Sequence, residues 1–271
     1  MQRRLKVLAI DVGNTRAKFG VFLVGPGNSI EPIDIVARVL DQTPDLGGDL
    51  AVWWLNHGSP DPARTMLAGS DPETRDLLLS RWPFKESPPT VVAGFQQIPI
   101  GVDVDVPANV GIDRLLNVFA AGCLQKQPRA VIVVDSGTAT TVDLMTEDQT
   151  FRGGSILPGL RLSAFALHDY TARLPLLDVD DAPAALPDAP GRNTEDAMRA
   201  GLMIGQLGAV RELVERLSHA AMNRIQQSVQ PEVIVTGGGG RQLVQHIADA
   251  KYIDSLALHG LALLAGKVAG R

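Results

Sequence analysis

Two short turns in this sequence carry residues suited to holding a phosphate group. The first is Asp11-Val-Gly-Asn-Thr-Arg-Ala-Lys18. Its glycine lets the backbone come close to a phosphate, Asn14 and Thr15 offer hydrogen-bond donors, and Lys18 is a candidate phosphate contact. Asp11 could hold a hydrated Mg²⁺, which typically takes only one or two carboxylates. Taken alone, the pattern also fits an ordinary hairpin turn, because Asp-x-Gly turns are common.

The same pattern returns in the second half of the chain. Asp135 lies 124 positions after Asp11 and opens the turn Asp135-Ser-Gly-Thr-Ala-Thr-Thr141. Two such turns facing one another would form a phosphate clamp. In the second turn the predicted donors are Gly137, Thr138, Thr140 and Thr141.

A glycine run is the third candidate nucleotide segment. The stretch Val233-Ile-Val-Thr-Gly-Gly-Gly-Gly240 is typical of a buried strand that ends in bare backbone, where an adenine or ribose could lie. It also fits a simple strand-to-helix turn. Neither a Gly-x-x-x-x-Gly-Lys-[Ser/Thr] loop nor a Gly-x-Gly-x-x-Gly after a strand is present, so these two common nucleotide sites are not supported.

A candidate acceptor site lies between these segments, in Pro107-Ala-Asn-Val-Gly-Ile-Asp-Arg114. Asp113 could accept the proton of an attacking hydroxyl, and Arg114 could bind a carboxylate or phosphate through two parallel hydrogen bonds. A capped helix start with a surface ion pair is the other interpretation, since Asp is favoured in the first turn of a helix.

The sequence predicts that these residues are positioned by the strands and helices of two similar halves. Each phosphate turn follows a short apolar run and precedes a second one, which predicts two β-hairpins. The offset between the turns predicts a duplicated α/β architecture, divided into residues 1–122 and 123–271. The remaining expected elements are a strand at 90–93, helices at 73–82, 111–127 and from Asn193 or Thr194 to about 227, and an exposed loop at 178–193.

Two further patterns bear on packing. Gly201, Gly205 and Gly208 share one stripe of the last predicted helix, which indicates a close approach by another element, either within the chain or in a second subunit. Trp53 and Trp54 with Leu55 indicate a strand or core segment.

Composition narrows the class of protein. The 271 residues carry a formal net charge of −5, which argues against a nucleic-acid binder. The basic N-terminal stretch precedes an apolar run too short for a signal peptide or a membrane span, so we expect a cytoplasmic protein. The single cysteine, Cys123, excludes an intrachain disulfide, and the five histidines show no metal-ligand spacing.

The three nucleotide segments, in this order, resemble those of the superfamily of actin, heat-shock ATPases and acetate and sugar kinases. With two more segments, the chain resembles the type III pantothenate kinases. The segments that carry this resemblance are Asp11-Val-Gly-Asn-Thr15, Gly111-Ile-Asp-Arg114, Asp135-Ser-Gly-Thr-Ala-Thr-Thr141, Gly153-Gly-Ser-Ile-Leu-Pro-Gly159 and Asn193-Thr-Glu-Asp-Ala-Met-Arg-Ala-Gly201.

The resemblance implies an α/β fold of two duplicated ribonuclease H-like halves of the actin-like ATPase type, with nucleotide in the cleft. It implies ATP-dependent phosphorylation of pantothenate, the first step of coenzyme A synthesis, by a homodimer that needs Mg²⁺ and a monovalent cation, K⁺ or NH₄⁺. Asp113 would be the general base, Asp135 would hold the monovalent cation, and Thr138 would contact ATP. The other implied ATP contacts are Asp11, Val12, Gly13, Asn14, Thr15, Arg16, Ala17 and Lys18, and the implied pantothenate contacts are Gly111, Ile112, Asp113, Arg114 and Thr194.

One departure from the family pattern concerns the acceptor pocket. Family members usually carry a tyrosine seven residues before the glycine of the Gly-x-Asp-Arg motif, where this chain has Val104. Two other functions stay open. One is a kinase or phosphatase of the same superfamily with another small substrate, and the other is a non-catalytic regulator of the Bvg accessory factor group, which shares this sequence pattern.

Overall fold

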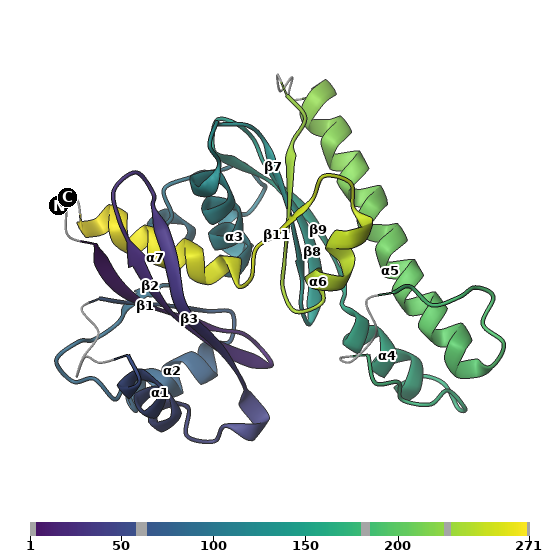
Figure 1. The fold of residues 1–271 in the computed structure, drawn as a ribbon, viewed down its shortest axis with the longest axis horizontal. Coiled ribbons are helices and arrows are strands. Elements are labelled where there is room, and N and C mark those ends of the chain that lie inside the picture. The colour runs from purple at the N-terminus through teal and green to yellow at the C-terminus, as the bar shows by residue number, and fades with distance from the viewer. Residues whose placement is uncertain (1–3, 58–63, 180–184, 225–228, 270–271) are drawn as a thin grey trace. The chain divides into compact units, whose positions relative to one another are not determined.

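The computed structural model describes residues 4–57, 64–179, 185–224 and 229–269. They form two compact units (Figure 1). The first unit comprises Met1–Lys126 and Ser255–Arg271, and the second comprises Gln127–Asp254. No helix within the described residues is long and apolar enough to cross a membrane.

A five-stranded mixed sheet forms the centre of the first unit, with strand order β3-β2-β1-β4-β5. The first three strands are antiparallel, as the predicted hairpin requires, and β4 and β5 add in parallel to β1. The strands are β1 (Leu5–Val12), β2 (Arg16–Val24), β3 (Ile30–Val39), β4 (Thr65–Gly69) and β5 (Thr90–Val92). The other elements are α1 (Leu46–Leu55), α2 (Pro72–Ser80), α3 (Ile112–Leu124), α7 (Leu256–Ala269), the short strand β6 (Gly101–Val102) and 3₁₀ turns at Leu40–Gln42, Phe95–Gln97 and Pro107–Asn109.

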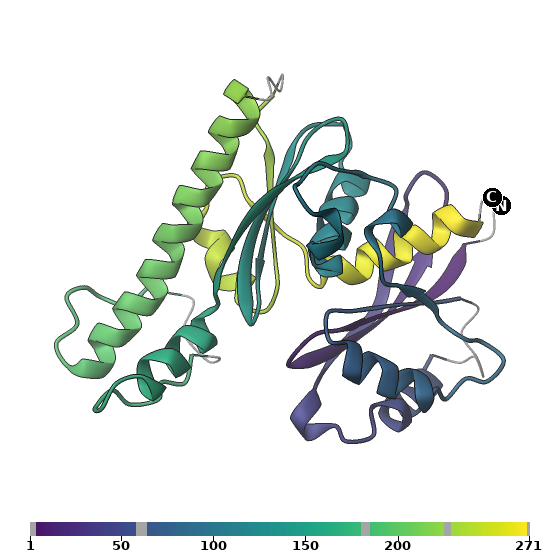
Figure 2. The ribbon, with the colours of Figure 1, turned by 180° about the vertical axis from the view of Figure 1, so that it is seen from behind.

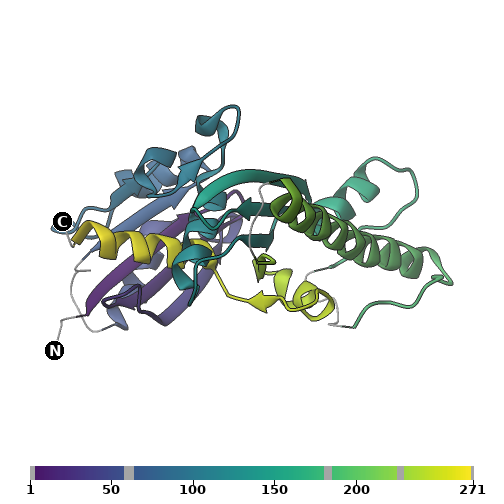
Figure 3. The same ribbon diagram turned by 90° about the horizontal axis from the view of Figure 1, so that it is seen from above.

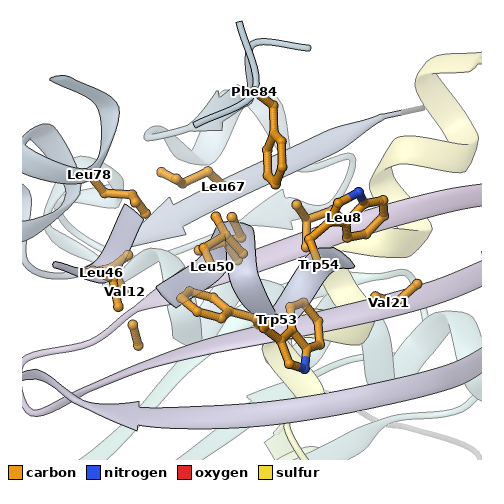
Figure 4. Packing of buried hydrophobic residues seen from close by; sticks show 13 residues of the cluster. Leu8, Val12, Val21, Leu46, Leu50, Trp53, Trp54, Leu67, Leu78 and Phe84 are labelled. Carbon is orange, nitrogen blue, oxygen red and sulfur yellow. The ribbon is translucent and has the colours of Figure 1, made fainter. Parts of the chain in front are cut away.

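One face of this sheet packs against α1 and α2 (Figure 4). Leu8 and Val12 of β1 meet Trp53 and Trp54 of α1 there, and Trp54 is completely buried. Trp53, Trp54 and Leu55 therefore lie in a helix, so the strand interpretation of this segment was wrong and the core interpretation holds for the two tryptophans. The helix begins where the Asp45 carboxylate accepts a hydrogen bond from the backbone amide of Gly48.

The other face of the sheet is covered by α3 and α7, which also pack against each other (Figures 1 and 2). A Cβ atom on Gly260 of α7 would lie 2.5 Å from the carbonyl oxygen of Leu116 of α3, so the two helix backbones approach closely. The ring of His259 meets that of Phe22 on β2 at a centroid distance of 5.0 Å. Because both faces are covered, β1 is a nearly continuous apolar run.

The second unit repeats this topology. Its own strands follow the order β11-β10-β7-β8-β9, with an antiparallel group of three and two parallel additions, which matches β5-β4-β1-β2-β3 element by element. The predicted duplication is confirmed at the level of sheet topology. The strands are β7 (Val131–Ser136), β8 (Ala139–Met145), β9 (Thr150–Pro158), β10 (Glu232–Thr236) and β11 (Lys251–Tyr252).

Helices of the second unit include the long α5, Thr194–His219, drawn in green in Figure 3. Asn193 caps it by accepting a hydrogen bond of 2.9 Å from the amide of Asp196, which confirms the predicted helix start. A π-helical turn follows at Ala220–Arg224, and the rest of the predicted helix lies outside the described residues. The others are α4 (Leu160–Asp169), α6 (Gly240–Leu243) and the 3₁₀ turn Val244–His246.

The last helix differs from the sequence-based division into 1–122 and 123–271. Although α7 follows the strands of the second half, its contacts place it with the first unit, against β1, β2 and α3. The predicted loop 178–193 contains no helix or strand in its described part, and residues 180–184 lie outside the described residues.

Candidate active site

The first predicted phosphate turn joins β1 to β2. Asp11 and Lys18 lie directly opposite each other across the two strands, so their side chains share one face of the sheet. Val12 and Ala17 point to the other face and are completely buried in the core, so only their backbone could serve a ligand. The side chains of the turn residues Asn14, Thr15 and Arg16 are exposed.

The face that carries Asp11 is the one covered by α3 and α7. Val7 and Ala9 precede Asp11 at two-residue spacing, whereas Leu8 and Val12 belong to the opposite core. Helix α3 holds Asp113 in its first turn. Two of the predicted functional carboxylates therefore belong to the same side of the first sheet.

Gly111 and Asp113 form a tight arrangement at the start of α3. Gly111 is the residue that caps the helix, and one carboxylate oxygen of Asp113, Oδ1, accepts a hydrogen bond of 2.9 Å from the amide of Arg114. Both Asp113 and Arg114 are half-buried, while Ile112 is buried and fixes the turn to the core. Val104, at the position of the usual tyrosine, is half-buried in the loop that follows β6.

The second phosphate turn joins β7 to β8 and meets the glycine run after β10. Gly237 has a φ of +84°, and a Cβ atom there would lie 2.5 Å from Oδ1 of Asp135 and 2.4 Å from the carbonyl oxygen of Ser136. The amide of Gly239 donates a hydrogen bond of 3.0 Å to the same carbonyl oxygen. The backbone of the glycine run thus lies against Asp135 and Ser136, the last two residues of β7. The two predicted nucleotide segments are therefore neighbours.

Gly159 completes this cluster of backbone turns. Its amide donates to the carbonyl oxygen of Thr138, and a Cβ atom on it would lie 2.2 Å from the carbonyl oxygen of Gly137. The glycine that ends the segment 153–159 therefore packs against the tip of the second phosphate turn, where Thr138 is exposed.

Thr140 does not offer a donor to a phosphate, and its prediction as one was wrong. It is completely buried on the face that carries Val142 and Leu144, and its hydroxyl accepts a hydrogen bond of 2.7 Å from Nε2 of Gln206 on α5. The alternation of Thr140, Val142 and Leu144 is the signal that could have revealed this, because alternate residues of a strand share a face.

Tyr252 is a residue that sequence reasoning missed. Its hydroxyl donates to the carbonyl oxygen of Gly237 at 3.1 Å, and its ring lies 3.1 Å from where a Cβ atom on Gly240 would be. Burial, together with the nearby Asp254 carboxylate, raises the pKa of Tyr252 above its ordinary value, so the hydroxyl stays a donor. Tyr252 thereby supports the glycine run from β11.

Thr194, the predicted substrate contact at the start of α5, lines an apolar groove between α4 and α5. The groove has a volume of about 930 Å³ and is lined mainly by aliphatic side chains, among them Leu162, Leu167 and Met198. Leu162 and Tyr170 at this groove are exposed, Tyr170 to 90%. Figure 2 shows α4 lying beside the first turns of α5.

Comparison with known proteins decides the family. The family model for type III pantothenate kinases matches residues 7–216. A type III pantothenate kinase of Dehalococcoides mccartyi is 31% identical over 267 residues, which cover 96% of each chain. Another, of Rhodospirillum rubrum, is 31% identical over 269 residues, or 95% of this chain and 97% of that one. This chain belongs to the type III pantothenate kinase family.

Solved structures confirm the fold expected for a type III pantothenate kinase. A Baf family transcriptional activator of Campylobacter jejuni superposes with a TM-score of 0.60 at 17% identity, covering 97% of this chain and 100% of that one. A 2-dehydro-3-deoxygalactonokinase of Sinorhizobium meliloti gives 0.52 at 16% identity, with coverages of 97% and 96%. The fold is that of the actin-like ATPases and sugar kinases, and the chain is a kinase by family.

The candidate cation sites of this pantothenate kinase family member would each use only one or two protein side chains. The described residues contain no group of three or more His, Cys, Asp and Glu side chains that could form a closed metal site. A monovalent cation or a hydrated Mg²⁺ needs no such group, since single carboxylates, backbone carbonyls and waters can hold it. Asp135 beside the bare backbone of Gly237 suits the first, and Asp11 at the end of β1 suits the second.

Proposed function

We propose that this kinase transfers the γ-phosphoryl group of ATP to the hydroxyl of pantothenate, giving 4′-phosphopantothenate and ADP in the first step of coenzyme A synthesis. The observation that supports it most is the family match over residues 7–216, which includes the two phosphate turns and the Gly-x-Asp-Arg segment. The related kinases named above span almost the same length as this chain.

In this proposal, Asp113 takes the proton of the attacking hydroxyl while the new oxygen–phosphorus bond forms. The bond between the γ-phosphorus and the β,γ-bridging oxygen breaks, and ADP leaves with the bonding electron pair. The first turn of α3 suits the role because Gly111 leaves space for the Asp113 carboxylate. Phosphoryl transfer depends mainly on positioning and on stabilising charge.

The turn between β1 and β2 would hold ATP through Asp11, Gly13, Asn14, Thr15, Arg16 and Lys18, with Val12 and Ala17 contributing backbone alone. Thr138 would also contact ATP. Mg²⁺ near Asp11 would neutralise phosphate charge, and a monovalent cation would lie at Asp135. Gly111, Ile112, Asp113, Arg114 and Thr194 would contact pantothenate.

The partner in solution would be a second copy of the chain, bound through the exposed side of α4 and α5. Gly201, Gly205 and Gly208 line this side, and a Cβ atom on any of them would meet nothing within 4 Å among the described residues. Packing within the described part of the chain therefore does not account for the stripe. Each glycine costs about 1 kcal/mol in a helix, which a close helix contact between subunits would offset.

A coupled assay of ATP turnover tests this function. It compares pantothenate with acetate and glucose as acceptors, and K⁺ with Na⁺ at equal ionic strength. Turnover that requires pantothenate and rises with K⁺ is expected, and it would also show that Val104 is compatible with the acceptor pocket. Turnover with acetate or glucose instead would mean that the kinase has a different acceptor specificity. ATP binding without turnover would favour the regulatory relatives.

A further inference from the structure

Gln206 is a polar residue in the middle of the apolar side of α5. It is 8% exposed and lies between the buried Met203, Leu207 and Val210. A buried carboxamide is unfavourable unless it forms hydrogen bonds. Its Nε2 atom donates to Oγ1 of Thr140 at 2.7 Å, a short bond between two side chains distant in sequence.

Thr140 connects this helix to the end of β7. Its hydroxyl donates to Oγ of Ser136, with 3.4 Å between the two oxygens, and both side chains are buried. That distance is long for a hydroxyl pair, so the contact is weaker than the Gln206 bond. With Gln206 donating to its oxygen and no solvent at this completely buried side chain, the Thr140 hydroxyl has Ser136 Oγ as the acceptor for its own proton.

Ser136 is where the second phosphate turn and the glycine run meet. A Cβ atom on Gly239 would lie 2.6 Å from Oγ of Ser136, and the amide of Gly239 binds the Ser136 carbonyl oxygen. Asp135 and Gly137, on either side of Ser136, belong to the proposed cation site and phosphate turn. A displacement of the Ser136 side chain would therefore shift both proposed nucleotide segments.

The far side of the Gln206 carboxamide faces the helical turns that follow the glycine run. A cavity of about 10 Å³ there is lined by Gln206, by Gln242 of α6 and by His246 of the next 3₁₀ turn, among others. Gln206 thus lies between the strand that leads out of the phosphate turn and the helical segment that leads out of the glycine run.

We propose that Gln206 is a positioning residue for the nucleotide, which acts through Thr140 and Ser136 to hold the second phosphate turn and the glycine run in register. The proposal rests on the proposed function in one respect, that these two segments bind ATP. Gln206 itself would contact no substrate.

Four variants test this proposal: Gln206→Leu, Thr140→Val, the double variant, and Val210→Ala as a control. Val210 is a fully buried neighbour on α5, so its truncation loosens the same helix without touching the hydroxyl pair. For each protein, the affinity for ATP is measured directly without acceptor, the KM values for ATP and pantothenate by turnover, and the unfolding temperature by calorimetry.

We expect Gln206→Leu to weaken ATP binding by about 5- to 10-fold, because ATP must then order the two nucleotide segments as it binds, with the KM for pantothenate unchanged. Thr140→Val should weaken it to a similar extent, and the double variant no further than either single one. Val210→Ala should lower the unfolding temperature and leave ATP affinity unchanged.

Three results would overturn the proposal: normal ATP affinity in Gln206→Leu, an equal loss in Val210→Ala, or effects of Gln206 and Thr140 that multiply in the double variant. If Gln206→Leu does not fold, Thr140→Val and a Gln206→Met variant decide. Methionine is an unbranched side chain of similar length that cannot donate to the Thr140 hydroxyl, and wild-type ATP affinity in both variants would overturn the proposal. Because ATP affinity is measured without acceptor, an error in the assigned acceptor would leave this test intact.

Discussion

A Cβ atom on Gly111 would lie 2.5 Å from Oδ1 of Asp113, closer than real Cβ contacts allow. Gly111→Ala should therefore displace the Asp113 carboxylate and lower kcat by about 10- to 100-fold, since a shift of about 1 Å in a reacting group can cost that much. Steady-state kinetics would check this, with ATP affinity expected to stay normal. Gly25→Ala, whose Cβ atom would meet only ordinary contacts, is the matched control. An unchanged kcat in Gly111→Ala would show that the carboxylate position is not restricted by this glycine.

Asp113→Asn removes the proposed base while keeping the size of the side chain. Turnover should fall by about 10²- to 10⁴-fold, the usual contribution of general base catalysis. Equilibrium binding of ATP should remain within about twofold of wild type, because Asp113 is proposed to act on the acceptor hydroxyl. Asp169→Asn, at the end of α4, serves as the control. Turnover close to wild type in Asp113→Asn would remove Asp113 from the role of base.

Asp135→Asn tests the proposed monovalent cation site. Loss of the carboxylate charge should weaken K⁺ stimulation, so that a K⁺ titration of turnover shifts to at least about tenfold higher concentration, as expected when one charged contact is lost. The unfolding temperature is measured in parallel, because the carboxylate lies close to Gly237. A K⁺ titration identical to that of wild type would contradict a cation site at Asp135.

Replacing Gly205 by Glu should weaken the proposed dimer. A Cβ atom at Gly205 meets nothing within 4 Å among the described residues, so the monomer can accept the side chain, and replacing a helical glycine should if anything stabilise it. A buried charge at a subunit interface is unfavourable, so sedimentation should show dissociation at concentrations where wild type is dimeric. Glu215→Gln, farther along α5, is a control for charge. A Gly205→Glu protein that stays dimeric would place the interface elsewhere.

The stability of the second unit should depend on pH through Glu232. Its carboxylate is 9% exposed and receives ion pairs from Arg129 at 3.1 Å and Lys251 at 2.6 Å. Burial alone would raise the pKa of Glu232, but these two cations outweigh it and hold the pKa below its ordinary value. Because the pKa is lower in the folded state, the stabilisation is present above about pH 4.3, the ordinary glutamate value, and is lost as the pH falls through the folded-state pKa.

Urea unfolding between pH 7 and pH 3 would measure this dependence. Glu232→Gln should be less stable than wild type at pH 7 by about 1 kcal/mol, because Arg129 and Lys251 are partly exposed and stay hydrated when they lose the carboxylate. The difference should shrink as the pH approaches 3. A constant difference across this range would mean that Glu232 does not titrate on unfolding.

Much of the fold could be predicted from the sequence because its signals are local. The hairpin around Gly13 and the cap at Asn193 each depend on a few adjacent residues, and both were located correctly. The helix that contains Trp53 and Trp54 was missed because Gly47 and Gly48 weaken its helical pattern directly after the cap.

The candidate site was harder to predict, because it depends on which face of each strand is buried. Thr138 and Thr140 look equivalent in a threonine-rich turn, yet the first is exposed and the second faces α5. Gln206 and Tyr252 had no local signal, since their roles come from contacts with Thr140 and Gly237, which lie more than ten residues away in sequence. Gln206 and Tyr252 come close to the phosphate turn and the glycine run only once the second unit has folded.

Helix α7 has a consequence for how the polypeptide folds during synthesis. It covers β1, β2 and α3, yet it is made after the whole second unit. Domains generally fold as they emerge, with the N-terminal one first. Until residues 255–271 have left the ribosome, the part of this sheet face that α7 covers stays exposed, whereas the second unit has all its strands by residue 254. The second unit is thus the part of the chain able to fold first, and chaperone binding to stalled nascent chains should concentrate on the uncovered face of β1 and β2.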